Sequence, residues 1–323
     1  MLQIKNQLGL GQINNINFDE EHKPLFEYPK YLENYNYFTI NSEVEQEFLS
    51  NISNICSNLR KLIISLPQTQ RSLLQQHITF DNLHYNITLE KLCTIIQKQN
   101  KLKIFKITNC HSLLKNILLS LDFQKHSLAH SEFTKCDFNN INLKRFNNLY
   151  NLEYLTFKNC KGTILLDQRE VLNFTSFKLK ELSFIRNNWS VDVTSLMIKY
   201  LGASLQRLLI ENPTIPIIEN ILTYCSKLNF LKIRIDTRFN LLEFLENCHD
   251  NFEIINLYQT IELEFLKIVL NYIERNNNSL KVFGMTRLDK ELNDEEIKLF
   301  NQIKAKGVKI VDFYSLYNFY SYV

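Results

Sequence analysis

The sequence predicts an α/β solenoid, in which a short strand and a helix alternate along the chain and the strands form one parallel sheet. Two observations lead to this prediction. A short apolar pattern recurs at nearly constant intervals, and the segments between its copies have helical spacing. The composition agrees with it, because 45% apolar and 22% charged residues in a chain of 323 are close to globular averages. A large hydrophobic core is therefore expected.

The recurring pattern is Leu-x-x-Leu-x-Leu, with other large apolar residues allowed at the three fixed positions. From Leu102 onward the intervals between copies are 26, 24, 27, 26, 23, 24, 28 and 28 residues, and a gap of 43 precedes them. The copies begin at Leu59, Leu102, Leu128, Leu152, Leu179, Leu205, Leu228, Phe252, Leu280 and Val308. This period and core predict leucine-rich repeats, and hence a horseshoe with a parallel β-sheet on its concave face and helices on its convex face.

Each copy predicts one short strand. The fourth and sixth residues are two apart, so they point inward from the same face of a strand, and the first residue points inward as well. Three residues after the last apolar position stand Cys110, Cys136 and Cys160, which we expect to be small buried residues in the turn that leaves the strand. Asn187 and Pro213 occupy this position in the next two copies.

Between the copies, apolar residues at helical spacing predict the helices, at 193–203, 215–227, 241–250 and 263–278. Pro216 suits the first turn of its helix, and Gly202 is expected to be a C′ glycine. The stretch 67–92 is long enough to hold a degenerate repeat or an insertion, and Ser131 stands at an inward position.

These elements predict two parts of the chain. Residues 1–50 are expected to form an N-terminal lead-in and cap, and residues 51–323 a repeat domain of about nine to ten repeats. The ending DFYSLYNFYSYV (312–323) is expected to be a C-terminal cap, because so many aromatic side chains are poorly tolerated in water. An exposed docking tail is the alternative.

Motifs of catalysis and cofactor binding are not found. Gly9 and Gly11 lack the third glycine of a phosphate loop, and the seven cysteines include no Cys-x-x-Cys pair. His130 and Glu132 are neighbours on one predicted strand, but no nucleophile accompanies them. We therefore expect neither an enzyme, nor a cofactor, nor a metal site.

The sequence also bears on the compartment. No apolar run reaches the roughly 18 residues of a membrane span, and residues 1–23 contain no apolar segment of signal-peptide length. We expect an intracellular protein, cytoplasmic or nuclear, that is monomeric and does not bind a membrane. Its cysteines are expected to be reduced. The net charge of +3 is mild and indicates no partner.

The repeat register predicts a binding surface. The third, fifth and seventh residues of each copy alternate with the inward ones, so they face the concave side and line up in rows. Cationic and aromatic residues, which are enriched at the hot spots of protein interfaces, gather in the middle rows. We expect a protein or peptide to contact Tyr154, Lys158, Arg207, Phe230, Lys232, Arg234, Ile254 and Tyr258.

Two features qualify this surface. One row is apolar and indicates a partner that covers it: Phe230, Ile254, Val282 and Ile310. Alternatively, aliphatic stems cover one another there, or the register is displaced by one residue and these side chains belong to the core. Acidic residues interrupt the positive charge of the rows, so we do not expect nucleic acid: Glu181, Glu211 and Asp312.

The repeats, with PLFEYPKYLENYNYFTI (24–40) leading into LSNISNICSNLRKLII (49–64), resemble fungal F-box proteins with cysteine-containing leucine-rich repeats. The resemblance covers Pro24 to the C-terminus. It implies that the repeats hold the substrate of a ubiquitin ligase. The F-box of that family binds a Skp-type adaptor, but residues 1–23 are too short for one and lack its Leu-Pro opening. We expect adaptor binding only if an F-box lies upstream of Met1. The alternative is a free-standing scaffold or adaptor with no link to ubiquitination.

Overall fold

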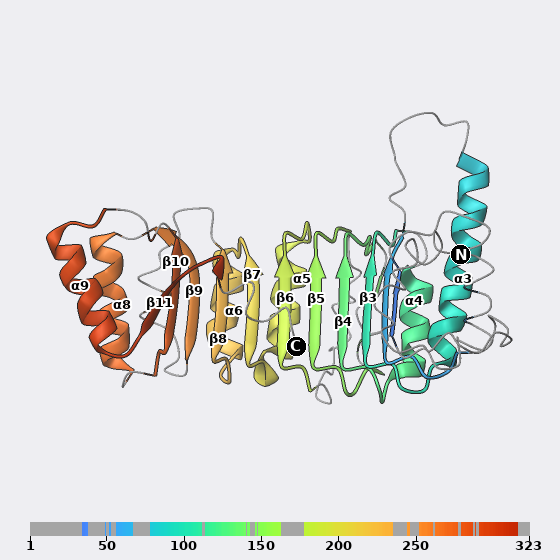
Figure 1. Ribbon diagram of the computed structural model, residues 1–323, viewed down its shortest axis with the longest axis horizontal. Helices are drawn as coiled ribbons and strands as arrows, with labels where there is room; N and C mark the ends of the chain where they lie inside the picture. Colours follow the sequence, from blue (N-terminus) through green and yellow to red (C-terminus); the bar gives the residue numbers. More distant parts are fainter. Residues whose placement is uncertain are drawn as a thin grey trace, which may run out of the picture. The chain divides into compact units, whose positions relative to one another are not determined.

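The computed structural model of the chain is an α/β structure in which short parallel strands alternate with helices (Figure 1). It divides into two compact units, Met1–Leu152 with Asn159–Arg169, and Glu153–Lys158 with Glu170–Val323. The structure describes residues 34–37, 49, 52, 56–66, 78–111, 114–139, 141–142, 146, 148–162, 178–234, 244–245, 252–260, 262–276, 279–286, 288 and 291–315. Among these residues, none of the helices is both long and apolar enough to span a membrane.

The first unit contains four of the described strands, which are parallel and adjacent in chain order: β1 (Asn34–Tyr37), β2 (Lys61–Ser65), β3 (Ile104–Thr108) and β4 (His130–Thr134). Helix α3 (Ile78–Lys98) connects β2 to β3. Helix α4 (Leu114–Leu121) and the 3₁₀ turn η3 (Asp122–Gln124) connect β3 to β4.

The long interval between the first two copies of the pattern is an insertion and not a repeat. Strands β2 and β3 pair directly along their whole length, from Lys61 with Ile104 to Ser65 with Thr108. The 21-residue helix α3 occupies the intervening stretch. A longer crossover helix therefore accounts for the gap of 43 residues.

The sequence analysis did not propose β1, although its signal is present. Strand β1 lies within residues 1–50, and its Asn34 pairs with Lys61 of β2. Leu32, Tyr35 and Tyr37 repeat the spacing of the pattern, with tyrosines in place of two leucines. A search restricted to aliphatic residues and phenylalanine passes over such a strand.

The second unit continues the arrangement with parallel strands in chain order: β5 (Tyr154–Lys158), β6 (Glu181–Ile185), β7 (Arg207–Glu211), β8 (Phe230–Arg234), β9 (Ile254–Thr260), β10 (Val282–Thr286) and β11 (Lys309–Asp312). Its described helices are α5 (Val191–Leu201), α6 (Ile215–Tyr224), α8 (Leu263–Arg275) and α9 (Asp294–Ala305), with a 3₁₀ turn η5 (Gly202–Ser204) after α5. The predicted helix at 215–227 is confirmed, with Pro216 in its first turn. Of the predicted helix at 241–250, only residues 244 and 245 are described, and both are helical.

Burial alternates along strands β2 to β5 and β7 as the pattern predicts. In β7, Leu208 and Ile210 are buried, whereas Arg207, Leu209 and Glu211 are partly exposed. We call the side of the second and fourth strand residues the inner face, and the side of the first, third and fifth residues the outer face. Helices pack on the inner face. The ring of Phe265 in α8, for example, lies 5.7 Å from that of Phe283 in β10.

The turn after each of the strands β3 to β7 repeats one conformation. The first residue after the strand has a left-handed backbone, with φ between 52° and 61°: Asn109, Lys135, Asn159, Arg186 and Asn212. The next residue is the predicted cysteine position. The thiol of Cys160 donates to the carbonyl of Phe133 at 3.2 Å, and the side-chain amide of Asn187 donates to the carbonyl of Phe157 at 2.9 Å. Cysteine and asparagine are equivalent here because the side chain of each donates a hydrogen bond to the backbone carbonyl of the fourth residue of a strand.

The prediction that Gly202 is a C′ glycine is wrong. Its φ is −56°, so it is not the left-handed C′ glycine of helix α5. A Cβ at this position would lie 2.9 Å from both the sulfur of Cys225 and the carbonyl oxygen of Tyr224. The close approach of the next repeat, and not backbone conformation, is what requires a glycine.

The last strand is displaced by one residue from the predicted rows. Lys309 pairs with Val282, and Ile310 pairs with the buried Phe283. Ile310 therefore does not belong to the outer apolar row, because a slip of one residue exchanges the two faces of a strand. The cause lies before the strand, where Val308 precedes β11 by one residue, whereas Leu280 precedes β10 by two.

We predict that Asn187→Ala lowers the free energy of unfolding by about 1–3 kcal/mol, because the carbonyl of Phe157 loses its donor. Asn187→Cys is expected to restore part of this loss, since Cys160 makes the equivalent bond. Urea unfolding followed by circular dichroism measures both changes. Asn188→Ala, at an exposed neighbouring position, is the control and should stay within about 0.5 kcal/mol of the original chain. Equal stability of the alanine and cysteine variants at position 187 contradicts the equivalence.

Candidate partner-binding surface

The outer face of the second unit carries all residues that the sequence predicts to contact a partner. They come from strands β5, β7, β8 and β9: Tyr154, Lys158, Arg207, Phe230, Lys232, Arg234, Ile254 and Tyr258. Cross-strand pairing brings them together in rows. Arg207 pairs with Phe230, and Phe230 with Ile254, so these three lie side by side at one end of the strands.

These side chains differ in their accessibility. Lys158 is exposed, and Tyr154 and Arg207 are half-buried. Phe230 and Lys232, in contrast, are only 4% and 2% exposed. The β5 end of the surface is therefore open, whereas much of β8 is covered.

Arg207 is held by a cation–π contact and an ion pair. Its guanidinium lies 4.7 Å from the ring centroid of Phe230, and its Nε lies 3.0 Å from a carboxylate oxygen of Glu181. Burial raises the pKa of Glu181, and the charge of Arg207 acts in the opposite direction. The two contacts fix the arginine on the surface, so little side-chain entropy is lost when a partner binds it.

A second cationic group lies at the other end of the strands. The guanidinium of Arg234 lies 4.9 Å from the ring centroid of Tyr258. On the neighbouring strand, the carboxylate of Glu211 pairs with Nε of Arg186 at 3.5 Å. The surface therefore presents flat arginine–aromatic stacks with acidic residues between them.

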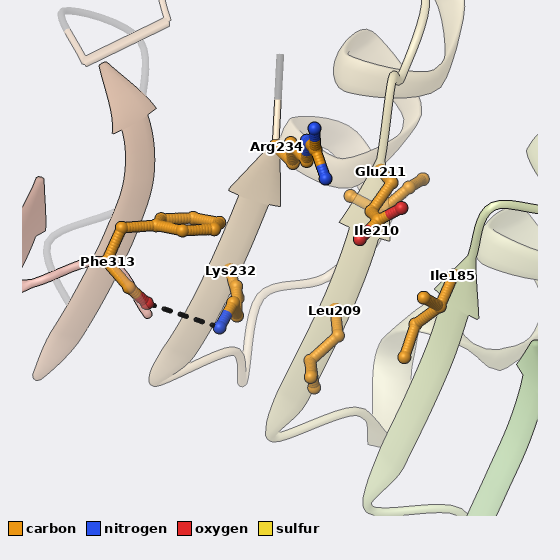
Figure 2. A pocket seen from close by; sticks show the side chains of 7 residues that line it. All are labelled: Ile185, Leu209, Ile210, Glu211, Lys232, Arg234 and Phe313. Atoms are coloured by element: carbon orange, nitrogen blue, oxygen red, sulfur yellow. Dashed lines mark hydrogen bonds between the residues drawn. The ribbon is translucent and has the colours of Figure 1, made fainter. Parts of the chain in front are cut away.

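Phe313, the residue after β11, covers the outer face of β8 and β9. Its N–H donates to the carbonyl of Met285 in β10 at 2.8 Å. Its ring lies 5.3 Å from that of Tyr258. Its carbonyl accepts a hydrogen bond from Asn256 at 3.1 Å. The same carbonyl accepts one from Nζ of Lys232 at 3.5 Å (Figure 2). One residue thus reaches across three neighbouring strands.

A shallow pocket lies beside Phe313, lined by Ile185, Leu209, Ile210, Glu211, Lys232, Arg234 and Phe313 (Figure 2). The space within it that a water-sized sphere can occupy is about 10 Å³. A cavity needs roughly 10–15 Å³ by this measure to hold one water molecule. The pocket is therefore a small surface depression about the size of one water molecule.

Lys232 is the most perturbed cation of the surface. Burial lowers its pKa to about 7, although the carboxylates of Glu211 and Asp312 act in the opposite direction. Its Nζ lies 4.5 Å from the ring centroid of Phe313. The amine is thus partly neutral near pH 7, and its seat beneath Phe313 is unfavourable for the charged form.

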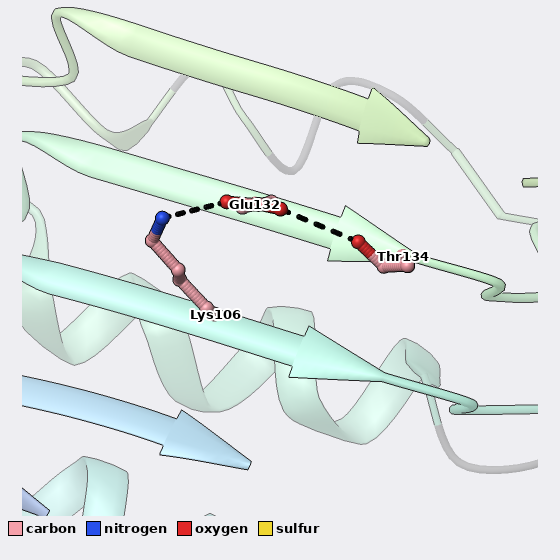
Figure 3. Close-up of polar contacts among 3 residues, drawn as sticks. All are labelled: Lys106, Glu132 and Thr134. Atoms are coloured by element: carbon pink, nitrogen blue, oxygen red, sulfur yellow. Dashed lines mark hydrogen bonds and ion pairs between the residues drawn. The ribbon is translucent and has the colours of Figure 1, made fainter. Parts of the chain in front are cut away.

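The outer face of the first unit carries a separate set of paired charges. Nζ of Lys106 lies 2.7 Å from the carboxylate of Glu132, and the hydroxyl of Thr134 donates to that carboxylate at 3.4 Å (Figure 3). Burial lowers the pKa of His130 to about 4, and the charge of Lys106 adds to this effect. His130 is therefore neutral at pH 7, beside an ion pair. Within the described residues, no cluster of three or more His, Cys, Asp or Glu side chains is able to hold a metal ion.

Sequence reasoning missed Asn256 and Phe313 as parts of this surface. Asn256 lies in the predicted row between Lys232 and Gly284, but one polar residue in a row carries little signal. Phe313 belongs to the aromatic ending, whose position on the sheet depends on contacts with residues far away in sequence.

Comparison with known proteins adds no assignment. No protein-family model matches the chain, and a search of curated proteins finds no match either.

We predict that Phe230→Ala acts first on folding, because this side chain is buried and stacked against Arg207. The expected loss in the free energy of unfolding is about 3 kcal/mol, measured by urea denaturation. Lys158→Ala is the matched control on the exposed part of the same face, with an expected change within about 0.5 kcal/mol. If Phe230→Ala leaves stability unchanged, the packing described for β8 is wrong.

Proposed function

We propose that this chain is a leucine-rich-repeat module that binds a protein or peptide on the outer, concave face of its sheet. The observation that carries the proposal is the constant register of the second unit, from Tyr154 paired with Glu181 to Phe230 paired with Ile254. Such a register aligns side chains of successive repeats on one continuous surface, as repeat proteins require for extended binding sites.

Three local features support the repeat class. The period of 23 to 28 residues matches it. The left-handed residue recurs after the strands β3 to β7. A cysteine or asparagine that donates to a strand carbonyl follows it in three of these turns, at Cys136, Cys160 and Asn187. Fold alone does not specify a function, so the binding role depends on the surface itself.

The chemistry of the surface favours a macromolecular partner. Its accessible part combines Tyr154, Lys158 and Arg207 with the apolar side chains of Ile185 and Leu209. Tyrosine and arginine dominate the hot spots of protein interfaces, and an apolar centre with a polar rim is typical of them.

The resemblance to F-box proteins extends this proposal to a cellular role. In that reading, the partner is a protein destined for ubiquitination, and a Skp-type adaptor joins the complex only through an F-box upstream of Met1. The alternative is a scaffold that binds its partner without ubiquitin machinery.

Photo-crosslinking tests the binding face. We predict that p-benzoylphenylalanine in place of Tyr154 gives a crosslink to one protein partner in cells. The same group in place of Ile297, an exposed residue of α9, should not. The adduct must form again with the purified partner and weaken severalfold in Lys158→Glu, since Lys158 is exposed on the same face at the other end of β5. Equal crosslinking from both positions, or from neither, overturns the proposal.

Purification of the full-length gene product separates the two roles. A ubiquitin-ligase receptor is expected to co-purify with the Skp-type adaptor in stoichiometric amount, whereas a scaffold brings down the crosslinked partner alone. Mass spectrometry of the complex measures the ratio. Absence of the adaptor excludes the receptor role and leaves the binding module intact.

A further inference from the structure

The chain turns onto the outer face of the sheet at the end of β11. The last strand pairs with β10, yet Phe313 contacts β9 through Tyr258 and Asn256, and β8 through Lys232. Phe313 thus lies over strands that precede it in the chain. It lies on the outer face, where the proposed partner binds, and not on the inner face with the helices.

Phe313 makes the kinds of contact that an external peptide makes on such a surface. Its aromatic ring lies against Tyr258 and against the amine of Lys232. Its backbone carbonyl accepts a hydrogen bond from the side chain of Asn256. An aromatic anchor with hydrogen bonds to its backbone is the usual way in which an extended peptide is held.

We propose that the turn at residues 313–315 is an intramolecular ligand, a clasp whose Phe313 occupies the outer face of β8 and β9 until a partner with its own aromatic anchor displaces it. The displacement by a partner rests on the proposed function. The clasp itself rests only on the contacts of Phe313. It explains why Lys232, which lies on the same face as the predicted contact residues, is covered.

The site that Phe313 occupies contains a group that destabilises the closed state and therefore favours displacement of the clasp. Lys232 lies beneath Phe313, and the charged and titratable groups that face it are Glu211 of β7, Arg234 of β8, Tyr258 of β9 and Asp312 of β11. Burial of its amine opposes closure whenever the amine is protonated. Tyr314, the next residue, is 51% exposed, and its ring lies 6.1 Å from that of Tyr258.

A synthetic peptide tests whether the segment is a ligand. We predict that the peptide Asp312–Val323, labelled with tetramethylrhodamine on its N-terminus, binds the full-length Phe313→Ala chain at least tenfold more tightly than the original chain. In the original chain the tethered copy competes with it. Fluorescence anisotropy measures the dissociation constants. A peptide carrying Phe313→Ala is the control and should bind neither protein.

A second variant distinguishes loss of the clasp from misfolding. Phe313→Leu keeps an apolar side chain but removes the ring that contacts Lys232, so it is expected to bind the peptide more weakly than Phe313→Ala and more tightly than the original chain. Peptide that binds neither folded variant, or binds the original chain equally well, overturns the clasp. Tyr154 lies on β5, away from the contacts of Phe313, so the crosslinking experiment tests the binding module independently.

The clasp also predicts a pH dependence whose sign follows from Lys232. Its pKa is about 7 beneath Phe313, against an ordinary value of 10.5. Closure therefore releases a proton between these values, and peptide binding to Phe313→Ala should tighten from pH 7 to pH 9, by at most about tenfold per pH unit. Below pH 7 the effect levels off. In the double variant with Lys232→Met this dependence should disappear, and a dependence that persists contradicts the role of Lys232.

Discussion

A hydrogen bond from the cysteine or asparagine in the turn to a carbonyl of the preceding strand links one repeat to the next at Cys136, Cys160 and Asn187. The left-handed residue before it turns the chain out of the strand, and the donor then ties the turn to a neighbouring strand, as Cys160 does for Phe133. Each of these hydrogen bonds helps to fix the register between two neighbouring strands. Because side chains alternate across a strand, a fixed register decides which residues form the core and which face outward.

The last strand illustrates what happens when the spacing changes. Val308 stands one residue closer to its strand than Leu280 does to β10, and the outer and inner positions exchange accordingly. The apolar row inferred from the sequence therefore ends at Val282. Ile310 was placed in it by counting from the pattern, whereas hydrogen bonding aligns it with Phe283.

Strands β2 to β11 and helices α5, α6 and α8 could be predicted from the sequence because they follow from local periodicity. Leu208 and Ile210 are buried because they occupy the fourth and sixth positions of the pattern. Helix α6 begins at Ile215, with Pro216 in its first turn. Sequence reasoning did not reach features that depend on distant neighbours. The need for Gly202 arises from Cys225 and Tyr224 of the next repeat. Tyrosines at Tyr35 and Tyr37 hid the first strand, because the search favoured aliphatic side chains.

The candidate surface also contains a contact that local sequence patterns do not reveal. The pattern correctly assigned Arg207, Lys232 and Tyr258 to the outer face, but a face that points outward need not be exposed. Phe313 lies 81 residues from Lys232 in sequence, and no local signal relates the two. A lysine beneath a permanent cover is poorly suited to its place, since an apolar side chain of similar length fills the same space without the cost of burying an amine. Its presence there is understandable if the cover is temporary, because the same amine is well placed for a partner once Phe313 has moved away.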